Sequence, residues 1–104
     1  MTVGRKGSAM NAKQVSARLR TVPNWSKRGQ TILRTFAFTG FLEGIDFVNR
    51  IARNAEKSRH HPDITIRYNK VTLKLTTHDA GGLTEKDFSL ARQCDKVFSK
   101  YFGA

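Results

Sequence analysis

Two alternating segments with only two residues between them, 64–68 and 71–77, constrain the fold of this chain more than any other feature. In both segments apolar residues alternate with polar ones, which is the pattern of half-buried β-strands. A two-residue turn at Asn69 and Lys70 predicts a hairpin in which the numbers of facing residues sum to 139, as 69 and 70 do. All apolar residues of the hairpin then lie on the same face. The chain must therefore build an antiparallel sheet with one face that other elements cover.

The remaining periodic segments supply three helices and another hairpin. In chain order they are a helix over residues 11–22, a short strand opened by Trp25, a strand over residues 31–38, an amphipathic helix over residues 41–60, and a last helix that Thr84 and Asp87 open as a capping box. The order is therefore α-β-β-α-β-β-α. It predicts the α+β class, a single domain with a four-stranded, mainly antiparallel sheet and three helices on one face. The other face is expected to be wet and to carry Arg34, Thr65, Arg67, Thr72 and Lys74.

Length and charge bound the organisation of the chain. It has 104 residues, which predicts one domain, and a net charge of +11. Residues 1–10 are small, polar and basic, so we expect a disordered N-terminal extension ahead of a domain over residues 11–104. No carboxylate precedes Glu43, which leaves organellar targeting and contact with acidic partners open. No apolar run approaches the roughly 20 residues that span a bilayer, and we expect a cytoplasmic protein.

The three histidines of the chain are clustered. His60 and His61 are adjacent, and His78 follows beyond the second hairpin. The predicted register places His61 opposite His78, so all three imidazoles are expected at one end of that hairpin. Histidine titrates near pH ~6.5, which suits it to proton transfer at neutral pH. An acid/base site is the leading hypothesis, and Glu56, one helical turn before His60, is a candidate partner for an imidazole.

A metal site is the main rival, because imidazoles near Glu56 or Asp79 are common zinc ligands. Adjacent histidines, however, lack the four-residue step by which a helix presents two ligands on one face. Capping of the helix C-terminus by an imidazole explains one histidine and not three. No nucleophile elbow, phosphate-binding loop or dinucleotide motif is present, and the single cysteine, Cys94, falls among core positions of the last helix.

Three blocks of the sequence resemble the pterin-4a-carbinolamine dehydratase family. They are Glu56-Lys57-Ser58-Arg59-His60-His61-Pro62-Asp63, Tyr68-Asn69-Lys70-Val71, and the segment from Leu75 to Asp87 that contains Thr76-Thr77-His78 and Gly81-Gly82. The resemblance extends over about residues 22–101 and marks the domain as dehydratase-like. It implies dehydration of a 4a-hydroxytetrahydropterin to a quinonoid dihydropterin in tetrahydrobiopterin recycling, without a metal or an organic cofactor.

The resemblance also implies roles for individual residues. It makes His60, His61 and His78 catalytic, with His60 and His78 as the proton-transfer pair and His61 as a polarising contact. Glu56 is implied as a partner that supports the histidines without contacting the substrate itself. The implied substrate-binding residues are Trp25, Thr76, Thr77 and His78. For Trp25 two roles stay open, closing over the pterin ring or packing in the core.

Members of this family form homodimers or homotetramers, and some animal members also bind a homeodomain transcription factor. The partners expected for this chain are accordingly a small-molecule pterin and further copies of itself, with no membrane. The alternative function is a non-catalytic binding protein, or a transcriptional dimerisation cofactor, that uses the same fold and the basic surface. No motif of the sequence demands a nucleic acid or a transcription factor as a partner.

Overall fold

The computed structural model describes residues 8–103, and its elements follow the predicted order. The helices are α1 (Ala12–Leu19), α2 (Phe41–Ser58) and α3 (Glu85–Tyr101); the strands are β1 (Ser26–Arg28), β2 (Thr31–Ala37), β3 (Asp63–Arg67) and β4 (Lys70–Leu75); the 3-10 helix η1 (His78–Ala80) joins β4 to α3. The α+β class is confirmed. Of the extension expected over residues 1–10, residues 1–7 lie outside the described part of the chain, and the N–H of Met10 donates to the Leu83 carbonyl at 2.8 Å.

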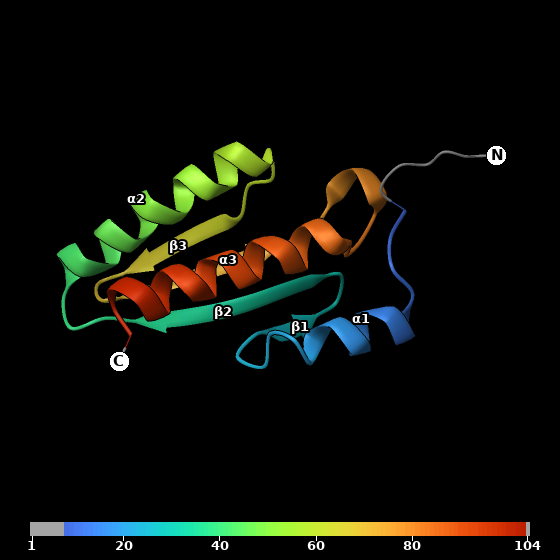
Figure 1. The fold of residues 1–104 in the computed structure, drawn as a ribbon, viewed down its shortest axis with the longest axis horizontal. Helices are drawn as coiled ribbons and strands as arrows, with labels where there is room; N and C mark the ends of the chain where they lie inside the picture. The colour runs from blue at the N-terminus through green and yellow to red at the C-terminus, as the bar shows by residue number, and fades with distance from the viewer. Residues whose placement is uncertain (1–7, 104) are drawn as a thin grey trace.

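The four strands form one antiparallel sheet in the order β1-β2-β4-β3. The connection through α2 carries the chain from β2 to the edge strand β3, and β4 then returns between them. Helices α2 and α3 run side by side across one face of this sheet, as Figure 1 shows. Among the described residues, no helix combines the length and the hydropathy that crossing a membrane requires.

The register of the second hairpin differs from the sequence prediction. Ile66 faces Val71, so the numbers of facing residues sum to 137 and the turn is formed by Tyr68 and Asn69. The predicted sum of 139 was wrong because Asn69 is held against the end of β2: its Nδ2 donates to the Phe38 carbonyl and its own carbonyl accepts from the Phe38 N–H, both at 2.9 Å. A shift of two residues preserves the alternation, so the apolar side chains still share one face.

The covered face of the sheet carries the core and includes one residue that was expected elsewhere. Its buried apolar residues are Ile32, Phe36, Val71, Leu73 and Leu75. Arg34 faces Leu73 and therefore lies on this face, not on the wet one. Its guanidinium contacts Asp95 of α3 at 2.6 Å and lies 4.2 Å from the ring centroid of Phe36. The prediction for Arg34 was wrong because Ile32 and Phe36 both point inward, and period-two alternation takes the residue between them inward as well.

The opposite face, which we call the open face, is polar as predicted. The register places on it Thr65 opposite Thr72 and Asp63 opposite Lys74. Arg67 also lies there, opposite Lys70 at the tip of the hairpin.

Candidate active site

The C-terminal end of α2 places the two adjacent histidines. Arg59 follows α2 in the left-handed region, with φ of 53°, and its N–H points back to the carbonyls of Ala55 and Glu56. The N–H of His60 then donates to the Ala55 carbonyl at 3.1 Å, which completes a Schellman motif. After this reversal His60 is only 9% exposed, whereas the next residue, His61, is exposed.

A buried carboxyl group, that of Asp87, holds the ring of His60. His60 Nε2 lies 2.5 Å from Asp87 Oδ1. The second oxygen, Oδ2, accepts from the Thr77 hydroxyl at 2.8 Å and from the N–H of Thr84 at 2.9 Å. Asp87 itself has 0% exposure, and Thr77 and Thr84 are also buried. The carboxyl group thus joins the end of α2, the loop after β4 and the first turn of α3.

These contacts select one tautomer of neutral His60. A carboxylate oxygen accepts hydrogen bonds, so the proton of the neutral imidazole is assigned to Nε2, facing Asp87. Nδ1 then carries the lone pair and is the nitrogen that can accept a further proton. Asp87 is therefore a positioning residue for His60.

The other two histidines are solvent-exposed. His61 Nε2 lies 3.0 Å from Glu56 Oε1, and 64% and 82% of the two side chains are exposed. Glu56 is thus the neighbour of His61 rather than of His60, and an ion pair as exposed as this one holds an imidazole only weakly. His78 is the first residue of η1 and is exposed as well.

The three histidines open onto one pocket of about 290 Å³. It is lined by Arg59, His60, His61, Thr76, Thr77, His78, Asp79 and Lys86. The predicted convergence of the imidazoles is confirmed, but the strand register does not cause it, because His61 precedes β3 and His78 follows β4. The pocket is just below the ~300–1,000 Å³ typical of small-molecule sites, so it suits one small ligand. Within residues 8–103, no three His, Cys, Asp or Glu side chains are grouped to hold a metal ion.

Both threonines of the expected binding loop lie in the pocket wall with their hydroxyls already bonded. Thr76 Oγ1 donates to the Gln30 carbonyl at 2.6 Å, and the Thr77 hydroxyl contacts Asp87 and Thr84. The two side chains therefore stabilise the loop from the inside.

Trp25 is not brought to the histidine pocket. It is 4% exposed, and its Nε1 donates to Asp95 Oδ1 at 2.9 Å. Its ring packs edge-on against Phe36, with centroids 6.1 Å apart. The structure thus shows the core-packing role for Trp25, with the indole N–H satisfied.

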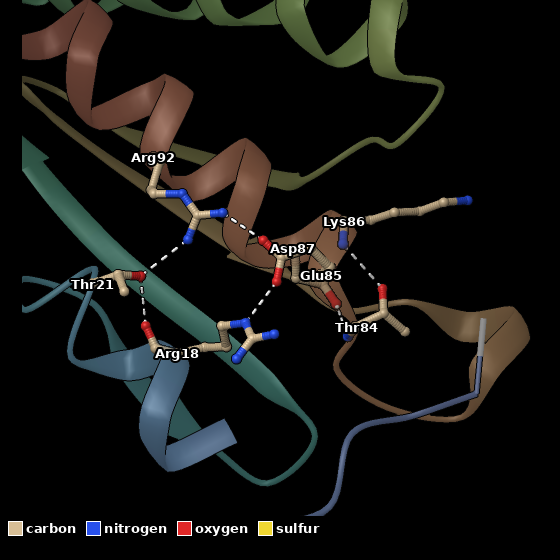
Figure 2. A network of polar contacts seen from close by, with 7 residues as sticks. All are labelled: Arg18, Thr21, Thr84, Glu85, Lys86, Asp87 and Arg92. Atoms are coloured by element: carbon tan, nitrogen blue, oxygen red, sulfur yellow. Dashed lines mark hydrogen bonds and ion pairs between the residues drawn. The ribbon is translucent and has the colours of Figure 1, made fainter. Parts of the chain in front are cut away.

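A network of ion pairs and hydrogen bonds connects α1 to the start of α3, next to the pocket (Figure 2). Glu85 accepts from Arg18 Nε at 2.8 Å and from Arg92 Nη2 at 2.5 Å. Arg92 also donates to the Thr21 hydroxyl at 3.0 Å. The hydrogen bond from Arg18, with a smaller contribution from Arg92, holds the pKa of Glu85 below its ordinary value. Since Glu85 begins α3, the network helps to fix the turn that contains Asp87.

Asp87 is the site residue that sequence reasoning missed, because it was interpreted only as part of a helix start. The capping box of Thr84 and Asp87 is confirmed, and the same carboxyl group also binds His60. A pattern that indicates burial of this carboxyl group is present in the sequence: Asp87 shares an apolar stripe with Ala91 and Cys94, at steps of four and three. A carboxylate in a core stripe needs a buried partner.

Fold and pocket together define a class of protein: a four-stranded antiparallel sheet with helices on one face, and a histidine pocket where the end of one helix meets the loop before the last helix. The sequence profile of the family described as "Pterin 4 alpha carbinolamine dehydratase" matches residues 8–97. The chain belongs to this family.

Curated relatives and solved structures agree with this assignment. Proteins of Thermomicrobium roseum and a Picosynechococcus strain, both named "Putative pterin-4-alpha-carbinolamine dehydratase", are 51% and 55% identical to the chain. The alignments cover 82% and 81% of this chain and 91% of each relative. A crystal structure from Brucella melitensis, described as a transcriptional coactivator/pterin dehydratase, superposes with a TM-score of 0.83 at 32% identity, over 86% of this chain and 98% of that one.

A further similar structure shares the fold alone. It is a pterin dehydratase-like protein described as a RuBisCO assembly factor of the alpha-carboxysome. Its TM-score is 0.61 and its identity 22%, over 71% of this chain and 88% of that one. The same fold therefore occurs in a protein described by an assembly role.

Proposed function

We propose that this protein dehydrates a 4a-hydroxytetrahydropterin to the quinonoid dihydropterin by histidine acid/base catalysis. The observation that carries the proposal is the buried His60–Asp87 pair, which opens onto the same pocket as His61 and His78. Family membership and the names of the relatives support the same reaction.

The reaction needs one proton donor and one proton acceptor. The C4a–O bond breaks, and the hydroxyl group leaves as water after it takes up a proton. N5 loses its proton, and its electron pair forms the C4a=N5 double bond. The two transfers balance, so the enzyme returns to its starting charge once the protons exchange with solvent. General acid/base catalysis of this kind contributes typically 10²–10⁴-fold.

The geometry favours His60 as the base. Asp87 holds the His60 proton on Nε2, so Nδ1 can accept the proton from N5. His78 is the proposed acid, which protonates the leaving hydroxyl from the other wall of the pocket. His61, paired with Glu56, is the proposed polarising contact. The backbone around Thr76, Thr77 and His78 reads the amide-like edge of the pterin.

The test follows quinonoid dihydropterin formation from a chemically generated 4a-carbinolamine. We expect His60→Ala and His78→Ala each to lower the rate by roughly 10²-fold or more. Lys57→Ala, an exposed change on the last turn of α2, is the matched control and should leave the rate unchanged. A wild-type rate equal to that of buffer would reject the dehydratase and favour a non-catalytic binding protein. A loss below threefold in both histidine variants would reject this pair of residues.

The proposed setting is tetrahydrobiopterin recycling in the cytoplasm, by a homodimer or homotetramer. Exposed apolar side chains support self-association, since Phe41 and Leu42 of α2 are 45% and 77% exposed. The edge strand β3 adds Ile64 and Ile66, each 37% exposed. Light scattering on the purified chain tests this part, and a monomer at micromolar concentration would contradict it.

A further inference from the structure

The open face of the sheet carries a second pocket, which shares no residue with the histidine pocket. It measures about 690 Å³ and lies at the tip of the second hairpin. Its lining residues are Thr35, Arg67, Tyr68, Asn69, Lys70 and Thr72. No acidic side chain is among them, so this pocket, which we call the hairpin-tip pocket, is cationic.

The two cations of the hairpin-tip pocket face each other directly. Arg67 and Lys70 form the last pair of the β3–β4 ladder, and like charges in that arrangement destabilise a sheet. Within residues 8–103 neither side chain makes an ion pair with a carboxylate. Asp63 is the acidic residue on the paired strands of the open face. It faces Lys74, two open-face pairs along the ladder from Arg67 and Lys70. An anion between Arg67 and Lys70 would relieve their repulsion.

Hydroxyl groups and one aromatic ring surround this pair. Thr35 Oγ1 and Thr72 Oγ1 lie 2.8 Å apart, and since one hydrogen bond uses one of their two protons, the other proton is available to a ligand. Tyr68 is 69% exposed, in the left-handed region with φ of 49°. The double hydrogen bond between Asn69 and Phe38 anchors the turn that presents it. The tip therefore offers an exposed ring on an anchored turn beside two cations.

We propose that the hairpin-tip pocket binds single-stranded nucleic acid, with a phosphate between Arg67 and Lys70 and a base stacked on Tyr68. Both components of such a ligand find a counterpart, since cations and hydroxyls contact phosphates and an exposed ring accepts a base of any sequence. The net charge of +11 favours the encounter. A second copy of the chain is a poorer occupant, because it would bring the same cations to the face.

Fluorescence anisotropy of a labelled oligo(dT) 12-mer with the full chain, over a range of salt concentrations, tests the phosphate contacts. We expect the double variant Arg67→Gln/Lys70→Gln to reduce the slope of log K against log salt by about 0.7, the contribution of the one phosphate of a single strand that the pair is proposed to hold. The control is Lys96→Gln/Lys100→Gln on α3, which removes the same charge from exposed positions on the helical side. Equal effects of the two double variants would overturn the proposal, as would absence of binding at low salt.

The aromatic contact is tested separately with a polyanion that has no bases. We expect Tyr68→Ala to weaken oligo(dT) binding about tenfold, the size of one base–ring stack, and to leave heparin binding unchanged. A parallel loss for both polyanions would overturn the stacking arm of the proposal. Displacement of oligo(dT) by poly-glutamate at equal charge concentration would assign the pocket to an acidic protein instead. Circular dichroism of each variant confirms that the sheet is intact.

Discussion

Replacing Asp87 with asparagine separates positioning of His60 from simple packing. The substitution preserves volume but exchanges two acceptor oxygens for one acceptor and one donor group. The Thr84 N–H cannot rotate away, so the amide oxygen must take the Oδ2 position that receives it. The amide NH₂ then faces His60 Nε2, and His60 is forced to carry its proton on Nδ1. The proposed base loses its lone pair on the side of the substrate.

The magnitudes follow from the three hydrogen bonds of this buried carboxyl group. Bonds to a charged group contribute about 1.5–3 kcal/mol and neutral ones about 0.5–1.5 kcal/mol, so three exchanges cost about 3 kcal/mol of unfolding free energy. Loss of general-base catalysis should lower kcat by at least ~10²-fold. KM should change by less than about threefold, because Asp87 has no exposed surface with which to touch a ligand.

Three measurements on Asp87→Asn check this reasoning. Steady-state kinetics of quinonoid dihydropterin formation separates kcat from KM, urea denaturation gives the loss of stability, and ¹⁵N NMR of the imidazoles reports the tautomer of His60. Asp46→Asn is the matched control, since it makes the same chemical change on an exposed side chain of α2 that does not line the histidine pocket, and kcat should stay within about twofold. A variant with kcat within threefold of wild type and an unchanged His60 tautomer would refute the positioning role.

Three further predictions concern residues outside the pocket centre or at its rim. Burial, with a smaller contribution from Asp95, raises the pKa of Cys94 from 9.0 to about 12, which lowers its thiolate fraction about 10³-fold. A disulfide reagent should therefore label Cys94 only after unfolding, and rapid labelling of the native protein would contradict this. Glu85→Gln should lower the free energy of unfolding by up to about 1 kcal/mol at pH 7. Because the folded-state pKa of Glu85 is lowered, this stabilisation is present above the ordinary pKa of 4.5 and is lost as the pH falls below it. Urea titrations should therefore show a smaller cost at pH 3.5 than at pH 7, and an equal cost at both would count against the Arg18 pairing. Arg59→Gly should raise stability by about 1 kcal/mol, since Arg59 occupies a left-handed conformation that glycine adopts without strain, and a lower Tm in a thermal melt would argue against that strain.

The fold was predictable because each element has a local cause. Alternation in residues 64–68 and 71–75 specifies two strands, of which β4 is half-buried, and the capping boxes at Asn11 and Thr84 mark where helices begin. The hairpin register was not predictable in the same way. It depends on Phe38, a residue far along the chain whose N–H and carbonyl are both hydrogen-bonded to Asn69. A turn sequence without glycine leaves two registers close in energy, and a tertiary contact selects one.

The candidate site, like the fold, was predictable from the sequence only in part. Clustering of His60, His61 and His78 is visible in the sequence because all three histidines of the chain fall within one short stretch. The partner of His60 is not visible there, since Asp87 lies 27 residues away and already has a local role as a capping residue. Arg34 shows the same limitation: alternation with Ile32 and Phe36 turns it inward, but the partner that compensates its charge there, Asp95 on α3, lies 61 residues away.

The sequence by itself therefore determined which residues form strands and helices, that one face of the sheet is covered, and that the three histidines cluster, because these follow from periodicity and composition over short segments. Tertiary structure alone decided the hairpin register, the partner of Arg34, the core position of Trp25 and the pairing of His60 with Asp87. Each of these rests on hydrogen bonds or an ion pair between distant segments, made in a buried or partly buried place where a polar group must find a partner. Local sequence patterns do not identify that partner.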